Sequence, residues 1–154
     1  MDKIRVADNI RRHLERRIAF LLDCKSEELR QQKLGTLIHL LFMLAGDGGH
    51  IVNISSLGAL RPWPEHAHYC ASKAGVVMLT RALAKAWAPR IAVNSVAPGV
   101  IPFDKTDERI ERFIAATPAG RAGTGEEVAE AVLFFLKSTR FTTGQVVAVD
   151  GGLS

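Results

Sequence analysis

Apolar and polar residues follow two different periodicities along the chain. Apolar residues recur at helical spacing in five segments: 7–23, 26–44, 68–87, 106–116 and 125–137. Short runs rich in Val and Ile, typical of buried strands, occur in three others: 50–55, 90–96 and 145–149. From the first of these runs onward, strands and helices alternate. This order predicts an α/β fold in which right-handed crossovers place adjacent parallel strands in one sheet, with helices on its faces.

Serine, proline and glycine residues mark the ends of the first two predicted strands. Ser55 and Ser56 close the first strand, and the segment 97–99 (A-P-G) follows the second. The helix predicted over 68–87 begins after the long loop that leaves the first strand. In parallel sheets of this kind, ligands bind beyond the carboxyl ends of the strands. These three segments should therefore lie at one rim of the sheet and form a site there.

Tyr69 and Lys73 are the candidate chemical groups at that rim. They are four residues apart on a predicted helix, so both lie on the same helix face. A lysine ammonium favours the phenolate form of a nearby tyrosine, which suits the tyrosine to proton transfer. Ser56 can orient a carbonyl or an alcohol while Tyr69 gives or takes the proton. Such chemistry needs a hydride partner, which no side chain supplies.

Five motifs resemble the short-chain dehydrogenase/reductase family, in its order, over roughly residues 49–154. They are I-V-N-I-S-S at 51–56, Y-C-A-S-K at 69–73, V-N-S-V-A-P-G at 93–99, G-R-A-G-T-G-E-E-V-A-E-A-V at 120–132 and T-G-Q-V-V-A-V-D-G-G at 143–152. The resemblance implies a Rossmann-like, doubly wound fold and an oxidoreductase that uses NADP or NAD on a small-molecule carbonyl or alcohol. Within the family, the chain looks most like bacterial pteridine reductases or 3-oxoacyl carrier-protein reductases, and the substrate stays open.

The resemblance also implies a role for individual residues. Ser56 would orient the substrate, Tyr69 would act as acid/base, and Lys73 would favour the ionised tyrosine. Tyr69 and Lys73 would also hold the cofactor at its nicotinamide ribose. Four further residues would pack along the nicotinamide: Pro98, Gly99, Val100 and Ile101. No metal site is predicted, because His39 has no second ligand at metal spacing.

The glycine-rich turn that begins a complete member of the family has no counterpart in residues 1–48. That turn follows a strand and sets a pyrophosphate on a helix N-terminus, whereas Gly46, Gly48 and Gly49 precede a strand. We therefore expect a partial sheet of about three strands at 49–154, behind two helices in a segment at 1–48, as one globular unit overall. Cofactor binding should be impaired. The first strand should lie at a sheet edge that the N-terminal helices or another chain covers.

The charge and the cysteines set further expectations. The formal net charge is +4, and basic residues crowd the first predicted helix with acidic residues between them. This pattern favours a solvated helix face over a nucleic-acid or membrane surface. The two cysteines form no CxxC pair, and no apolar run reaches membrane-spanning length. A cytoplasmic protein with no nucleic-acid or membrane partner is expected.

The sequence is compatible with three functions. The first is a truncated short-chain dehydrogenase/reductase homologue of carbonyl-reductase ancestry, for which the sequence does not decide whether the chain alone is an enzyme. The second is a non-catalytic oligomerisation or interaction protein, and the third is one half of a split reductase completed by another chain. A homo-oligomer, a dimer or a tetramer, is expected because the helices at 26–44 and 68–87 carry apolar residues around more than a core-facing stripe.

Overall fold

The chain divides into two compact units, Met1–Gly48 and Gly49–Ser154. The computed structural model describes residue 40 and residues 43–102 and 108–154. Both helices predicted near the N-terminus, over 7–23 and 26–44, therefore lie outside the described residues, apart from a few helical residues at the end of the second. The sheet belongs to the second unit.

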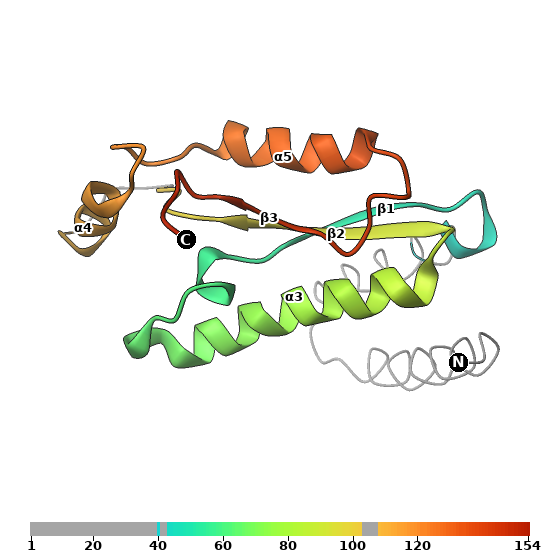
Figure 1. The fold of residues 1–154 in the computed structure, drawn as a ribbon, viewed down its shortest axis with the longest axis horizontal. Helices are drawn as coiled ribbons and strands as arrows, with labels where there is room; N and C mark the ends of the chain where they lie inside the picture. The colour runs from blue at the N-terminus through green and yellow to red at the C-terminus, as the bar shows by residue number, and fades with distance from the viewer. Residues whose placement is uncertain (1–39, 41–42, 103–107) are drawn as a thin grey trace, which may run out of the picture. The chain divides into compact units, whose positions relative to one another are not determined.

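Three parallel strands form the sheet: β1 (Gly49–Ile54), β2 (Ile91–Pro98) and β3 (Val146–Val149). Their order is β1-β2-β3, and both pairs are parallel. Helix α3 (Ala67–Trp87) covers one face of the sheet and α5 (Gly125–Lys137) covers the other (Figure 1). This arrangement confirms the predicted α/β fold and the adjacent parallel strands.

The central strand β2 is the core of the unit. Every residue from Ile91 to Ala97 is buried, because the strand has a neighbour on each edge and a helix over each face. The strand runs two residues further than the 90–96 segment predicted. Pro98 still pairs with Val149, and the Gly99 N–H donates to the Val149 carbonyl at 2.9 Å. Proline is tolerated there because it closes the strand and the next residue supplies the hydrogen bond.

Two buried polar residues of β2 fix its neighbours in register. Asn94 accepts from the Gln145 N–H at 3.0 Å and donates to the Thr142 carbonyl at 2.9 Å, at the point where β3 begins. Ser95 Oγ lies 3.0 Å from the Asn53 carbonyl and 3.1 Å from Ser55 Oγ, on the β1 side. The buried side chains of Asn94 and Ser95 thereby have hydrogen-bond partners, as burial requires.

The segments that connect the strands contain the remaining short helices. The loop between β1 and α3 contains two one-turn 3₁₀ helices that the sequence pattern did not predict, η1 (Leu57–Ala59) and η2 (Pro64–His66). Helix α4 (Glu108–Ala116) lies within the segment predicted at 106–116, whose first residues are outside the described part.

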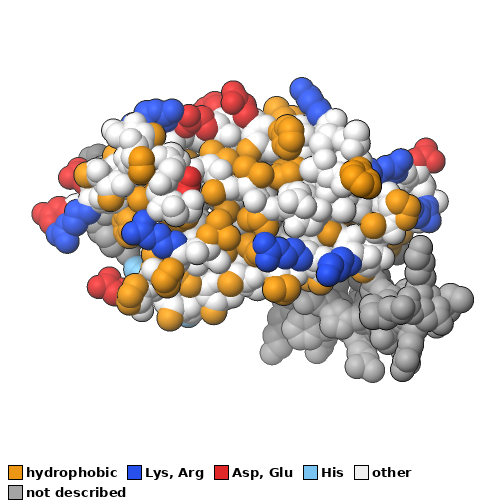
Figure 2. Space-filling view, viewed as in Figure 1, with side chains coloured by type: hydrophobic (Ala, Val, Ile, Leu, Met, Phe, Trp, Pro, Cys, Tyr) orange, Lys and Arg blue, Asp and Glu red, His pale blue; other side chains and the backbone are white. Residues whose placement is uncertain are grey.

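The surface mixes charged and apolar side chains. Figure 2 shows hydrophobic side chains spread over the face that it draws, with acidic side chains gathered over the first turns of α5. Several apolar side chains of α3 and α5 are exposed, among them Met78 and Phe134. None of the described helices combines the length and the apolar character needed to cross a membrane.

Candidate active site at the carboxyl ends of the strands

A cleft of ≈ 650 Å³ opens where the strands end. Its walls come from the β1–α3 loop, the first turn of α3, the segment after β2, and α4. The lining residues are Arg61, Pro62, Trp63, Pro64, Glu65, His66, Tyr69, Gly99, Val100, Ile101, Pro102, Ile110 and Phe113. The volume lies within the range of small-molecule sites, which is roughly 300–1,000 Å³. The predicted rim of the sheet is therefore a cleft of ligand size.

Tyr69 enters the cleft from the first turn of α3, and Lys73 lies one turn later on the same helix. The Lys73 Nζ atom is 5.8 Å from the centre of the Tyr69 ring. It also lies 3.4 Å from the Ile54 carbonyl, the last of β1, to which it donates. A lysine held by the strand end in this way keeps its positive charge near the tyrosine.

Three aromatic rings form what we call the aromatic wall: Trp63, Tyr69 and Phe113. The rings of Trp63 and Tyr69 are nearly parallel, with 5.9 Å between their centroids and 6° between their planes. The Phe113 ring, from α4, lies 5.6 Å from that of Trp63 and is tilted by 40°. Trp63 therefore connects the tyrosine of α3 to α4.

Ser56 lies two residues after the end of β1 and is buried. Its Oγ accepts a hydrogen bond from the Gly58 N–H at 3.2 Å, so it caps η1. The Gly58 backbone lies so close to Tyr69 that a Cβ atom there would be 3.2 Å from the ring atom Cε1. The turn that begins at Ser56 is thus packed against the Tyr69 ring.

Gly99, Val100 and Ile101 form what we call the backbone wall of the cleft. Gly99 needs to be a glycine, because a Cβ atom would lie 2.7 Å from Asp150 Cα. The Val100 carbonyl accepts from the Gly123 N–H at 3.0 Å. Gly123 lies close to the wall as well, since a Cβ atom there would be 2.6 Å from Ile101 Cδ1 and the end of the Ile101 side chain would have to shift. This wall is therefore clamped between β3 and the turn before α5.

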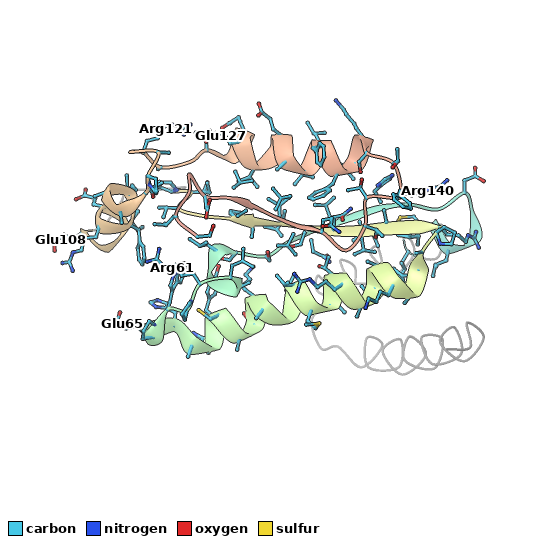
Figure 3. All side chains as sticks on the ribbon, in the orientation of Figure 1. Arg61, Glu65, Glu108, Arg121, Glu127 and Arg140 are labelled. Carbon is cyan, nitrogen blue, oxygen red and sulfur yellow. The ribbon has the colours of Figure 1, made fainter. Side chains whose placement is uncertain are left out.

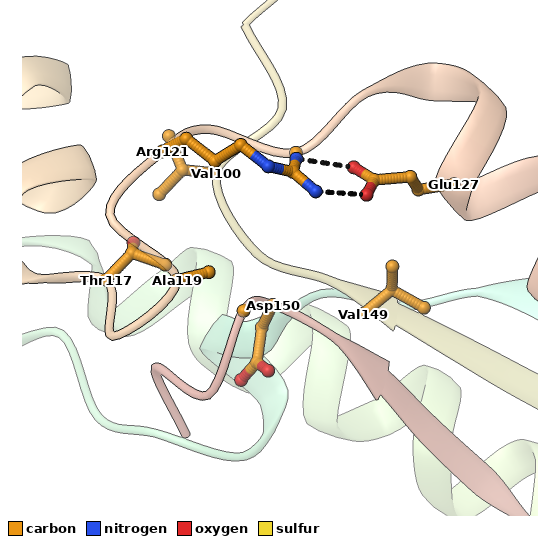
Figure 4. Close-up of a pocket in the computed structure, with 9 residues that line it drawn as sticks. Val100, Thr117, Ala119, Arg121, Glu127, Val149 and Asp150 are labelled. Atoms are coloured by element: carbon orange, nitrogen blue, oxygen red, sulfur yellow. Dashed lines mark hydrogen bonds and ion pairs between the residues drawn. The ribbon is translucent and has the colours of Figure 1, made fainter.

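An ion pair anchors the turn that holds the backbone wall (Figure 4). Arg121 makes two hydrogen bonds to the Glu127 carboxylate, at 2.6 and 3.0 Å. Glu127 also accepts from the Thr124 N–H at 2.9 Å, and Thr124 Oγ1 accepts from the Glu127 N–H, which completes a capping box at the start of α5. The hydrogen bonds from Arg121 and Thr124 lower the pKa of Glu127 to about 2.

The last residues of the chain form hydrogen bonds among themselves and one hydrogen bond to the β1–α3 loop. The Asp150 carboxylate accepts from the backbone N–H groups of Gly152 and Ser154, at 3.0 and 2.7 Å. Although burial raises the pKa of Asp150, these hydrogen bonds outweigh it, and the pKa lies below its ordinary value. Arg61 donates to the Leu153 carbonyl at 2.7 Å. Arg61 precedes η2, whose Glu65 points away from the sheet (Figure 3).

The structure brings most of the predicted site residues to one place. Tyr69, Gly99, Val100 and Ile101 line the cleft. Lys73 lies beside the Tyr69 ring, and Ser56 caps the turn whose Gly58 packs against that ring. Pro98 ends β2 and does not line the cleft. Among the described residues, no group of three or more His, Cys, Asp or Glu side chains could hold a metal ion.

Sequence reasoning missed the aromatic partners of Tyr69. Trp63 is conspicuous in the sequence, since it stands between two prolines in the R-P-W-P segment. That segment does not indicate which aromatic ring Trp63 contacts. Nothing in the sequence pointed to Phe113, because it lies in a helix whose distance from Tyr69 is set only by the tertiary fold.

Residues 34–154 match a family model described as enoyl-(acyl carrier protein) reductase. The 3-oxoacyl-(acyl-carrier-protein) reductase FabG of Chlamydia muridarum is 41% identical over 118 residues, which cover 73% of this chain and 48% of the relative. Carbonyl reductase family member 4 of Danio rerio is 42% identical over 146 residues, which cover 89% of this chain and 61% of the relative. The chain thus spans about half the length of the bacterial reductases that it matches.

Solved structures are also similar to this chain in sequence and in fold. An apo SCOR enzyme from Clostridium thermocellum is 34% identical with a TM-score of 0.65, over 80% of this chain and 49% of that one. A blue fluorescent protein from a metagenomic library, solved in complex with NADPH, is 35% identical with a TM-score of 0.65, over 70% of this chain and 46% of that one. These similarities agree with the resemblance carried by the five sequence motifs.

Proposed function

The chain belongs to the short-chain dehydrogenase/reductase family, and from this premise we propose that it carries the acid/base half of an NADP- or NAD-dependent carbonyl reductase. The observation that carries the proposal is the position of Tyr69 on the cleft, with the Lys73 ammonium 5.8 Å from the centre of its ring. The substrate is a small-molecule carbonyl or alcohol that fits the cleft of ≈ 650 Å³.

Each of the three candidate catalytic residues has a distinct task in this proposal. In reduction, Tyr69 donates its phenolic proton to the carbonyl oxygen, and in oxidation it accepts a proton from the alcohol. The Lys73 ammonium stabilises the phenolate. Ser56 Oγ accepts from the Gly58 N–H, so its own proton is left to orient the substrate oxygen. A dihydronicotinamide, when bound, supplies the hydride that no side chain provides.

We expect the described residues to bind the nicotinamide end of a dinucleotide better than its pyrophosphate. In this proposal, Lys73 contacts the nicotinamide ribose and the backbone wall contacts the nicotinamide ring, in keeping with the family resemblance. The glycine cluster at 46–49 runs in the order helix, turn, strand, whereas a pyrophosphate cradle runs strand, turn, helix. We therefore infer that these 154 residues alone bind the dinucleotide weakly, because phosphate hydrogen bonds are charge-assisted and strong.

A titration of the purified chain with NADPH and NADH, followed by calorimetry, tests this inference. We expect a dissociation constant no better than millimolar and no reduction of carbonyl compounds. A loss of three decades of affinity corresponds to about 4 kcal/mol, which several missing phosphate hydrogen bonds would account for. Saturation at micromolar cofactor would overturn the inference of weak binding.

Substitution of two lysines of α3 tests whether dinucleotide binding depends on the cleft. Lys73→Ala should remove whatever binding remains, because Lys73 lies beside Tyr69. Lys85→Ala, three turns further along α3 in the last turn of the helix, removes the same charge at a distance from the cleft and should leave binding unchanged. Equal losses in both variants would indicate a general charge effect and would contradict the proposed cofactor contact.

The position of β1 supports a second candidate function, half of a reductase that another chain completes. β1 is an edge of the three-stranded sheet, and Ile54 at its end is exposed. An edge strand offers backbone hydrogen bonds to another chain. Under this alternative, adding the separately expressed N-terminal half of a related reductase should produce NADPH oxidation with a carbonyl substrate. Tyr69→Phe should abolish that activity, and an inactive mixture would count against completion by a second chain.

We also propose that the chain forms a homo-oligomer, a dimer or a tetramer. Met78 and Leu79 on α3 are 62% and 52% exposed. Exposed apolar side chains on a helix favour association with another molecule. Light scattering across micromolar concentrations should show the oligomer, and the double variant M78K/L79K should be a monomer. An oligomer that binds no dinucleotide and gains no activity with a second chain would support a non-catalytic oligomerisation module.

A further inference from the structure

The aromatic wall leaves ring surface open to the cleft. Parallel rings in contact lie roughly 3.5–4 Å apart, so centroids 5.9 Å apart mean that Trp63 and Tyr69 are offset along their planes by roughly 4–5 Å. Part of each ring face is therefore not covered by the other ring. Both side chains and Phe113 are only half-buried, which agrees with this geometry.

The surface that Trp63 offers is carbon. Its indole Nε1 atom is buried and has no hydrogen-bond partner, so the accessible part of the side chain is the ring face and its carbon edge. Ile101 and Ile110 and three prolines add further apolar lining. A ligand in this cleft meets apolar and aromatic groups on most sides.

The charged groups of the cleft do not favour a charged ligand. Arg61 and Glu65 are both exposed and have opposite signs (Figure 3). One guanidinium nitrogen of Arg61 already donates to the Leu153 carbonyl. A carboxylate or phosphate on the substrate would meet an exposed guanidinium beside an exposed carboxylate of opposite sign, so it would gain little net attraction in return for the water that it loses.

We propose that the cleft selects a neutral carbonyl compound or alcohol whose reacting carbon bears a flat aromatic or conjugated ring, and that Trp63 is the residue that determines this selectivity. The ring extends the offset stack that Trp63 and Tyr69 begin, while Phe113 packs against its edge. The ring also brings the carbonyl next to the Tyr69 side chain. This inference rests on the proposed function for the role of Tyr69, but the ring selectivity concerns binding and needs no hydride transfer.

A matched pair of ketones tests the inference on the full chain. Acetophenone and cyclohexyl methyl ketone differ only in whether the six-membered ring is flat and aromatic or puckered and saturated. Ligand-observed NMR competition should show that acetophenone binds roughly two- to tenfold more tightly, the gain that an aromatic pair provides beyond its buried area. 4-Acetylbenzoate, which adds a negative charge, should bind more weakly than acetophenone.

Variants of the aromatic wall connect the selectivity to Trp63. Trp63→Leu keeps an apolar side chain and should bring the affinity ratio of the two ketones to about one, and Trp63→Phe should restore most of the ratio. Phe141→Leu is the matched control, since Phe141 is 98% exposed and does not line the cleft; its ratio should equal that of the unchanged chain. Circular dichroism confirms that each variant is folded.

The outcomes separate this inference from the proposed function. Ring selectivity that depends on Trp63 supports the inference whether or not the chain alone reduces a ketone, because binding needs no cofactor. If no ketone is reduced even after the N-terminal half of a related reductase is added, the proposed function fails while the inference stands. Reduction of both ketones by that mixture, with equal affinity for the two, supports the proposed function and overturns the inference. Equal affinities, a ratio unchanged in Trp63→Leu, or no binding of either ketone would each overturn the proposal.

Discussion

The aromatic wall of the cleft, Trp63, Tyr69 and Phe113, and the backbone wall, Gly99–Ile101, are held by different forces. Ring packing holds the aromatic wall, with centroid distances of 5.6 and 5.9 Å. The backbone wall is held by hydrogen bonds to β3 and to the turn before α5, and by glycines that allow close approach of the backbone. The two walls face the same space but differ in how much displacement they tolerate.

This difference suggests a division of tasks. Hydrogen bonds weaken steeply when their geometry changes, so the backbone wall has one position. Offset rings slide over one another at little cost, because dispersion contacts are numerous and individually weak. We therefore expect the backbone wall to fix the cofactor side of the site and the aromatic wall to adapt to the substrate. Changes in the backbone wall should cost stability, whereas changes in the aromatic wall should alter ligand selection first.

The largest effect should come from Gly99→Ala in the backbone wall. The added Cβ would lie 2.7 and 2.8 Å from Asp150 Cα and Cβ, so the backbone has to move. Overpacking of this kind costs about 1–3 kcal/mol. Urea denaturation should show a corresponding decrease in the free energy of unfolding.

Gly75→Ala is the matched control for Gly99→Ala. Gly75 lies in α3, and a Cβ atom there has no neighbour within 4 Å. Alanine is favoured over glycine in a helix by about 1 kcal/mol, so this variant should be equal to or more stable than the unchanged chain. A Gly99→Ala protein as stable as Gly75→Ala would contradict the close approach at the backbone wall.

A smaller loss of stability is expected from Thr124→Ala, which breaks the capping box at the start of α5, next to the turn that holds the backbone wall. The Thr124 hydroxyl accepts from the Glu127 N–H, and its removal leaves that donor without its cap. Loss of such a cap costs about 0.5–2 kcal/mol. Thr124→Ser keeps the hydroxyl and should retain most of the stability in thermal unfolding, and equal losses in both variants would show that the cap is not the cause.

Gly58→Ala probes the aromatic wall with the same chemical change and should cost less than Gly99→Ala. Its Cβ would lie 3.2 and 3.3 Å from two atoms of the Tyr69 ring, which can shift by a few tenths of an ångström. We expect a loss of about 1 kcal/mol or less, comparable to an off-rotamer side chain. Trp63 fluorescence should change because the ring stacked on it has moved. A loss larger than that of Gly99→Ala would contradict the contrast between the walls.

The sequence predicted the backbone wall better than the aromatic wall. The order of strands and helices and the V-N-S-V-A-P-G segment indicated where the polypeptide turns at the end of β2, and the structure confirms the parallel neighbours. Glycine and proline mark such positions locally, because they act on the backbone itself. The continuation of β2 to Pro98 was missed, since pairing with Val149 is a property of the sheet and not of the segment.

The aromatic wall depends on distances that no local pattern contains. Tyr69 and Lys73 were predicted as a pair because helical spacing alone places them together. The contact between Trp63 and Phe113 joins a loop to a helix far away in the chain. Its formation depends on how α4 packs, and an amphipathic pattern in α4 indicates burial without identifying the partner. A functional wall made of such contacts becomes visible only in three dimensions.

The smallest effect concerns the Arg121–Glu127 pair, and it depends on pH. Glu127 has a folded pKa of about 2, below its ordinary value of 4.5, chiefly because Arg121 donates to it. A carboxyl group with a lowered folded pKa contributes stability above its unfolded pKa and loses that contribution as the pH falls through the folded value. The contribution should therefore be present above about pH 5 and disappear between about pH 4.5 and 2. Both side chains are exposed, so the effect should be modest.

Thermal unfolding at pH 7, 5, 4 and 3 measures this contribution. The unchanged chain should lose stability on acidification more steeply than Glu127→Gln, whose amide cannot titrate. Glu130→Gln, an exposed substitution on the same helix, should keep the full acid sensitivity. High salt should reduce the difference between the first two proteins, because exposed ion pairs are screened. If Glu127→Gln and Glu130→Gln respond to acid alike, the pair does not stabilise the turn. The backbone wall is then held by the hydrogen bonds of Gly99 to Val149 and of Gly123 to Val100, together with the glycine contacts.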